Sequence, residues 1–226
     1  MDLSFSVHKL AKCSANPGEV HIEGLIHLLR YIRYNKTLGL KYYTDINDAP
    51  VTDLLRQANI KTKNHLIDFY DSSWKYCPDT GKITGSYITF YKGGPIDHVT
   101  HVPEPVVQSR VASEYNAECT AVMALAHFRM LIHELLNKGK DIVPEEDPLI
   151  VLDIKYVICM ANNVKYTKPT IHLARRMHFV KNGEKFKMHK IYLCEGGLQL
   201  ADIGIRNVSE PDITQRIKYI MVRIEN

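Results

Sequence analysis

Four acidic residues stand where a folded chain would bring their carboxylates together. Asp71 follows the mostly apolar run LIDFY, Asp153 ends the run LIVLD, and Glu114 and Asp202 lie within helical patterns. Carboxylates are hard oxygen ligands, and two divalent ions about 3.5–4 Å apart can hydrolyse a phosphodiester bond. The residue types therefore indicate metal-dependent phosphodiester chemistry. The alternative is chance placement, because the chain has 25 acidic residues.

The elements that must position these residues follow from the hydrophobic pattern after residue 65. Short strands separated by turns predict an antiparallel meander, and the wholly apolar LIVL predicts a buried central strand. This order of elements predicts an α/β fold with a mixed sheet. The predicted elements are a strand followed by a turn at 65–74, strands at 86–91 and 96–102, a helix at 108–136, a strand at 149–153, helices up to 162 and at 169–180, a strand at 190–195 and a helix from about 198.

Asp153 and Glu114 have the clearest structural context among the four. LIVLD would bury four apolar residues and then present a carboxylate at the carboxyl end of a strand, where α/β ligand sites lie. After Glu114, the small residues Ala117, Ala121 and Ala124 recur at helical spacing. They would let the long helix lie close to the sheet and bring Glu114 towards the strand ends.

The first 64 residues have a different texture. Residues 20–34 carry apolar side chains at helical spacing, residues 38–44 predict a strand, and a short helical piece at 51–57 interrupts a polar connector. We therefore expect a small N-terminal segment at 1–64 and the main domain at 65–226.

Composition and charge indicate an ordinary globular protein. The formal net charge is +4, and the five scattered cysteines form no CxxC pair, which predicts free thiols in a reducing compartment. The N-terminus shows no apolar signal region, and no stretch approaches the roughly 18 apolar residues of a membrane span. We expect an intracellular protein, cytoplasmic or nuclear, without a membrane partner.

Positive charge is concentrated between residues 165 and 190, where eight Lys and Arg residues stand against Glu184 alone. Such a segment could follow a phosphate backbone, or it could be a solvated helix face. The candidate nucleic-acid contacts are Arg175, Arg176, Lys181, Lys185 and Lys187.

Several stretches resemble the ribonuclease H region of copia-type retrotransposon pol polyproteins. FYDSSW with DTGKITGSYITFYKGGPIDH is similar to the opening strands, SRVASEYNAECTA to the glutamate-bearing helix, LDIKYVICMA to an aspartate-led strand end, and QLADI to the last acidic motif. NPGEVHIEGLIHLLRYIRYNKTLGLKYY resembles the end of the reverse transcriptase thumb and its connection. The resemblance covers nearly the whole chain.

The resemblance implies a ribonuclease H-like fold, with a mixed five-stranded sheet flanked by helices and a small N-terminal connection segment. It implies that Asp71, Glu114, Asp153 and Asp202 bind two Mg²⁺ or Mn²⁺ ions and cleave the RNA strand of an RNA–DNA hybrid. The register of Glu114-Tyr115-x-Ala117 selects Glu114 rather than Glu118. The remainder of a reverse transcriptase is a further expected partner. No polymerase motif is present, so we expect no DNA synthesis.

Other positions leave a second interpretation open. Tyr156, Ile171 and residues 204–207 depart from the family pattern, which favours an inactive transposon-derived remnant that binds nucleic acid or protein. The intact carboxylates favour the enzyme. His178 is a candidate for protonating the leaving group, and an ordinary surface or core histidine is the alternative.

Overall fold

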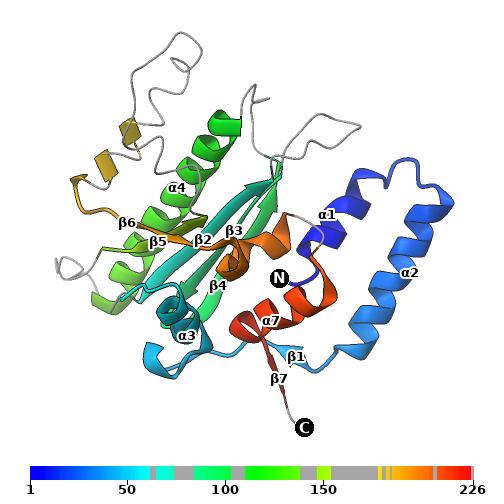
Figure 1. Ribbon diagram of the computed structural model, residues 1–226, viewed down its shortest axis with the longest axis horizontal. Coiled ribbons are helices and arrows are strands. Elements are labelled where there is room, and N and C mark those ends of the chain that lie inside the picture. The colour runs from blue at the N-terminus through cyan, green and yellow to red at the C-terminus, as the bar shows by residue number, and fades with distance from the viewer. Residues whose placement is uncertain are drawn as a thin grey trace.

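A mixed five-stranded sheet forms the centre of the computed structural model (Figure 1). The strand order is β4-β3-β2-β5-β6, with β2 antiparallel to β3, β3 antiparallel to β4, and β5 parallel to both β2 and β6. Their bounds are β2 (Leu66–Ser73), β3 (Thr84–Tyr91), β4 (Gly94–His101), β5 (Leu149–Asp153) and β6 (Lys190–Cys194). The predicted meander and the α/β class are confirmed, and the arrangement is compatible with a ribonuclease H-like fold.

The structure describes most of the chain. The described residues are 1–61, 65–73, 84–102, 110–137, 147–153, 178–179, 182–183, 185–205 and 208–224, without the side chains of Ser73, of residues 110–118 and of Asn137. The helices predicted for 154–162 and for most of 169–180 lie outside these residues.

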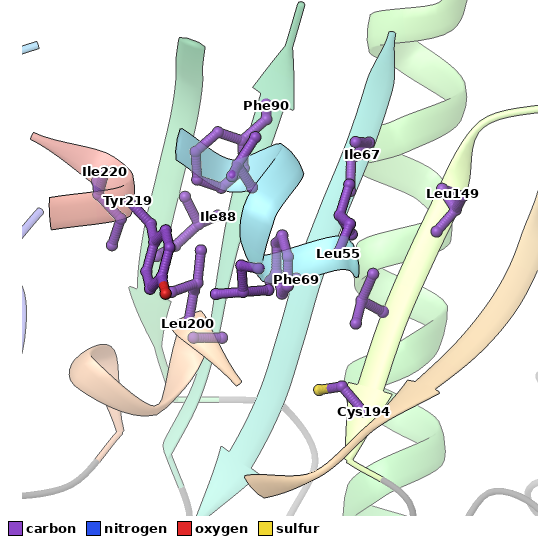
Figure 2. Close-up of a cluster of buried hydrophobic side chains, with 14 of the residues drawn as sticks. Leu55, Ile67, Phe69, Ile88, Phe90, Leu149, Cys194, Leu200, Tyr219 and Ile220 are labelled. Atoms are coloured by element: carbon purple, nitrogen blue, oxygen red, sulfur yellow. The ribbon is translucent and has the colours of Figure 1, made fainter. Parts of the chain in front are cut away.

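Helices cover both faces of the sheet. One face packs against α4 (Arg110–Asn137), through buried residues such as Ala121, Val122 and Leu125. The other face packs against α3 (Pro50–Gln57), the 3₁₀ helix η4 (Leu200–Gly204) and α7 (Glu210–Ile220). Figure 2 shows apolar side chains of β2, β3 and β5 facing those of α3, η4 and α7. This second layer holds the larger core.

The N-terminal elements lie beside this core and partly within it. They are α1 (Ser4–Lys12), α2 (Glu19–Tyr34), β1 (Leu38–Gly39) and the 3₁₀ helix η1 (Ile46–Asp48). The helix predicted at 20–34 is confirmed, and it stands away from the sheet in Figure 1. The strand predicted at 38–44 is only two residues long among the described residues, and it pairs with β7 (Val222–Arg223).

Residues 46–60 are part of the main core. Ile46, Val51, Leu54, Leu55 and Ile60 are buried in one cluster with residues of the central strands. The tight β3–β4 turn packs onto this segment: Lys92 and Gly93 have φ values of 48° and 77°, as two-residue hairpin turns require. A Cβ added at Gly93 would collide with that of Ala49. The domain division at residue 64 stays a prediction, and it would cut through this part of the core.

One helix corrects the expectation about apolar stretches. Residues Cys119–Leu136 of α4 are long and apolar enough to cross a membrane by length and composition alone. Part of this stretch nevertheless packs on the sheet, with Cys119, Ala121, Val122 and Leu125 buried. One such helix is weak evidence for a membrane span, because core helices of soluble proteins pass the same test. The stretch passes the test because Arg129 and Glu134 are its only Asp, Glu, Lys or Arg residues.

Candidate active site

Strands β2 and β5 bring Asp71 and Asp153 to the same end of the sheet. The two strands run parallel, with Ile67 opposite Leu149 and Phe69 opposite Val151. Continuing this register by two residues places Asp71 beside Asp153. Alternate residues share one face of a strand, so both carboxylates follow the face that carries Phe69 and Val151, towards η4. The prediction that LIVLD forms a buried strand is confirmed: its four apolar residues are buried, and Asp153 is exposed at its end.

Asp202 reaches the same place from η4. We expected it within the late helix; it lies instead in a short 3₁₀ helix that precedes α7. Gln199 anchors this element: its Nε2 donates to the carbonyl oxygens of Tyr70 at 3.0 Å and Val151 at 3.2 Å, and its Oε1 accepts from the backbone N–H of Ala201. Gln199 is fully buried, so η4 is fixed to the ends of β2 and β5. We call Asp71, Asp153 and Asp202 the acidic cluster.

Glycines allow η4 and its approach to lie directly on the sheet. A Cβ added at Gly204 would collide with Oγ of Ser86, the residue that pairs with Asp71 across β2 and β3. A Cβ at Gly196 would lie 3.2 Å from Oδ2 of Asp153. Gly204 is one of the positions that depart from the copia-type pattern that the sequence resembles, and here glycine is the residue that the close packing requires.

The electrostatics of Asp71 show how near the three carboxylates are. Burial raises the pKa of Asp71 well above its ordinary value, and the charge and hydrogen bond of Asp202 and the charge of Asp153 raise it further. The backbone N–H of Ser72, 2.7 Å from Oδ1 of Asp71, acts in the opposite direction. Asp71 is therefore within electrostatic reach of two other carboxylates, and a proton or a metal cation would offset their repulsion.

Cys194 lies next to the same carboxylates. It pairs with Asp153 across β5 and β6 and is fully buried at the β6 end of the core cluster (Figure 2). Burial raises the pKa of its thiol to about 12, with further increases from Asp153, Asp71 and Asp202. A thiol with such a pKa is protonated at neutral pH and is a poor nucleophile, so Cys194 acts as a small packing residue under the cluster.

Arg216 of α7 places a positive charge against the acidic cluster. Its Nη2 donates to Oδ2 of Asp202 at 2.9 Å and to the carbonyl oxygen of Gly196 at 2.9 Å. The two side chains are only 7% and 3% exposed. Helix α7 is fixed by its N-cap Ser209, whose Oγ accepts from the backbone N–H of Asp212. The arginine thus reaches Asp202 from a well-defined helix.

The donor set suits a hard divalent cation, but the arrangement does not hold one as it stands. Carboxylate oxygens are the ligands that Mg²⁺ prefers. Among the described residues, however, no group of three His, Cys, Asp or Glu side chains is arranged to hold a metal ion. One reason is visible: Arg216 already occupies Oδ2 of Asp202. Glu114, the fourth predicted ligand, lies early in α4, and its side chain is outside the described residues.

The other predicted site residues are only partly placed. Lys185 and Lys187 are exposed on the approach to β6, and His178 is exposed in a short helical stretch. Arg175, Arg176 and Lys181 lie outside the described residues, as do Tyr156 and Ile171.

Gln199, Cys194 and Arg216 are the site residues that sequence reasoning missed. Gln199 stands in the motif QLADI, but its hydrogen bonds to Tyr70 and Val151 join residues far apart in the chain and leave no local pattern. Arg216 follows Ile213 and precedes Ile220 at helical spacing, so it occupies an apolar-face position of α7. An arginine on the apolar face of a helix could have indicated a buried ion pair. Cys194 follows a strand pattern and carries no signal of its own.

The fold and the cluster define a mixed α/β protein with converging carboxylates at the end of its central strands. No family model matches the chain. Over 201 residues the chain is 22% identical to a retrovirus-related Pol polyprotein from transposon RE1 of Arabidopsis thaliana. The match covers 89% of this chain and 12% of that relative, so the chain corresponds to a small part of it. This similarity supports a retrotransposon pol origin.

Proposed function

We propose that this chain is a copia-type ribonuclease H, a magnesium-dependent endoribonuclease that cleaves the RNA strand of an RNA–DNA hybrid. The observation that carries the proposal is the convergence of Asp71, Asp153 and Asp202 from three separate elements. The similarity to a Pol polyprotein supports the same conclusion.

In the proposed reaction, different residues would bind the metal, position the cluster and contact the hybrid. Asp71 and Asp153 would hold the cation together with Glu114, and Asp202 would join them once it leaves Arg216. Bound divalent ions supply an activated water and a counter-charge for the leaving oxygen. Gln199 keeps η4 in place by binding the carbonyl oxygens of Tyr70 and Val151. Lys185 and Lys187 would contact the hybrid backbone, and the 2′-hydroxyl would distinguish the RNA strand.

The direct experiment is cleavage of an RNA–DNA hybrid, labelled on the RNA strand, by the purified chain with Mg²⁺ or Mn²⁺. We expect cleavage of the RNA within the hybrid, none of a DNA duplex, and loss of cleavage when a chelator is added. Cleavage that persists in the chelator would contradict the metal role. If a folded protein cleaves the hybrid with neither ion, the proposal that it is an enzyme is contradicted.

A second candidate is an inactive transposon-derived remnant that binds nucleic acid or protein. The buried pair between Arg216 and Asp202 favours it, because it neutralises one predicted ligand. The same cleavage assay separates the two candidates, because a remnant shows no turnover of the hybrid at any concentration of Mg²⁺ or Mn²⁺.

The two glutamates of α4 give a test of the site's register. Glu114→Gln should reduce hybrid cleavage by at least about 100-fold, in the range seen when an essential electrostatic group is removed. Glu118→Gln, one turn later on the same helix, is the matched control and should cost less than about fivefold. Cleavage rates at saturating Mg²⁺ measure both. The opposite ranking would show that Glu118 is the ligand.

The basic segment gives a test of nucleic-acid binding. Replacing Arg175, Arg176 and Lys181 with alanine should weaken hybrid binding and make the log–log salt dependence shallower by roughly 0.7–0.9 for each phosphate that the variant no longer neutralises. Fluorescence anisotropy at several salt concentrations measures this slope. The matched control replaces Lys9, Arg30 and Lys41, which are exposed in the N-terminal segment. Equal slopes in the two triple variants would exclude a specific role for the segment.

A further inference from the structure

The guanidinium of Arg216 places a permanent positive charge beside Oδ2 of Asp202, the oxygen that a divalent ion would need as a ligand. A guanidinium stays protonated at any physiological pH, so its bond to Asp202 does not open by deprotonation. Its Nη2 lies 2.9 Å from Oδ2 of Asp202, with both side chains almost fully buried. A divalent ion bound to the same carboxylate would stand beside this buried positive charge, and like charges close together in a buried site repel strongly.

The surroundings of Arg216 show that its side chain is more than a helix anchor. The same Nη2 also donates to the carbonyl oxygen of Gly196, and Gly196 in turn lies against Asp153. The guanidinium is thus within the acidic cluster, where its charge also lowers the pKa of Cys194 against the effect of the three carboxylates. Its Nε is buried and has no hydrogen-bond partner among the described residues. Buried donors in purely structural contacts are normally satisfied.

We propose that Arg216 closes Asp202 to divalent ions, so that the free protein binds metal through the other carboxylates of the cluster alone. Arg216 is then a positioning residue that sets how many ions the site accepts before substrate binds. The inference rests on the proposed function in one respect, which is that the acidic cluster binds divalent metal.

Calorimetric titration of the whole chain with Mn²⁺, without nucleic acid, tests the inference directly. Arg216→Gln removes the charge and keeps a donor, so it should bind one more Mn²⁺ per chain, or bind Mn²⁺ at least about tenfold more tightly. Arg216→Lys keeps the charge and should behave as the wild type. Adding Asp202→Asn to Arg216→Gln should remove the gain.

A second variant keeps the test valid even where Arg216→Gln does not fold. Arg216→Met also removes the charge and keeps an unbranched apolar stem in the buried position, so it should show the same gain in Mn²⁺ binding. Wild-type Mn²⁺ binding by folded Arg216→Met would overturn the inference. So would a wild-type titration curve from folded Arg216→Gln, as judged by circular dichroism.

The outcomes separate the inference from the proposed function. If the wild type binds Mn²⁺ and Arg216→Gln binds it identically, the metal site stands and only the role of Arg216 falls. If the wild type binds no Mn²⁺ and Arg216→Gln does, Arg216 blocks the whole site, and the inference that the other carboxylates bind metal in the free protein is overturned. If neither binds, both the inference and the metal-dependent function fail.

Discussion

Asp71→Asn and Asp153→Asn should each abolish hybrid cleavage, by at least about 1,000-fold, while the protein stays folded. Both substitutions keep size and remove the charge that would hold the cation. An essential electrostatic group in an active site contributes about 10²–10³ in rate, and loss of the ion itself costs more. Gel-based cleavage at saturating Mg²⁺ measures the effect.

The two variants should differ in stability, which distinguishes Asp71 from Asp153. The folded pKa of Asp71 is raised by burial and by Asp202 and Asp153. The folded state therefore holds the Asp71 proton more tightly than the unfolded state, and stability falls as pH rises above the unfolded pKa. Asp71→Asn removes this penalty. It should raise Tm above that of the wild type at pH 7 in chelator, by about 2–4 °C for each kcal/mol gained, and the gain should vanish at low pH.

Two variants serve as controls for the first prediction, Asp153→Asn for stability and Asp53→Asn for cleavage. Asp153 is exposed, so Asp153→Asn should change the unfolding free energy by only about 0.5 kcal/mol, as surface substitutions usually do. Asp53→Asn makes the same chemical change on the exposed face of α3 and should leave cleavage intact. Wild-type cleavage by either cluster variant would remove that residue from the site. A lower Tm for Asp71→Asn at pH 7 would contradict the raised pKa of Asp71 in the folded state.

A chain that begins at residue 65 should not fold. It lacks the buried residues Ile46, Ala49, Val51, Leu54, Leu55 and Ile60 of the main core cluster. Burial of each large apolar side chain contributes about 1.5–3 kcal/mol, so the five larger ones contribute roughly 8–15 kcal/mol. A domain's whole net stability is typically about 5–15 kcal/mol. Far-ultraviolet circular dichroism and a thermal melt would show the absence of folding.

The matched control for this second prediction is a chain that begins at residue 45. It keeps η1, α3 and the N-cap Asp45, whose Oδ1 accepts from the backbone N–H of Asn47. It removes α1 and α2, none of whose residues is buried. This chain should fold with a lower Tm. A cooperative melt of the chain from residue 65 would instead support an independent domain at 65–226.

The sequence predicted the strands best where burial is complete. LIVLD and LIDFY carry apolar residues on both faces, and β5 and β2 are buried on both faces by α4 and by η4 with α7. The hydrophobic pattern alone therefore indicated both strands and placed Asp71 and Asp153 at their ends. The pattern could not show that the two strands are neighbours, since their pairing joins residues far apart in the chain.

The site could be predicted only in part, for physical reasons that differ by residue. Asp202 was assigned to an α-helix because local spacing does not separate α from 3₁₀ geometry over five residues. The ion pair of Arg216 with Asp202 joins an arginine on an apolar helix face to an acid 14 positions away. The distribution of charge along a sequence cannot reveal such a pair, because it depends on how α7 packs on η4.

The pairing of β1 with β7 and the shared core of α3 and α7 tie early residues to late ones. During synthesis on the ribosome, Leu54 and Leu55 emerge long before Tyr219 and Ile220, which lie in the same core cluster. At about 5–20 residues per second, the delay is roughly 8–33 s. Throughout that interval the apolar face of α3 lacks its final cover and is open to non-native contacts, and a chain that ends before α7 cannot complete this core.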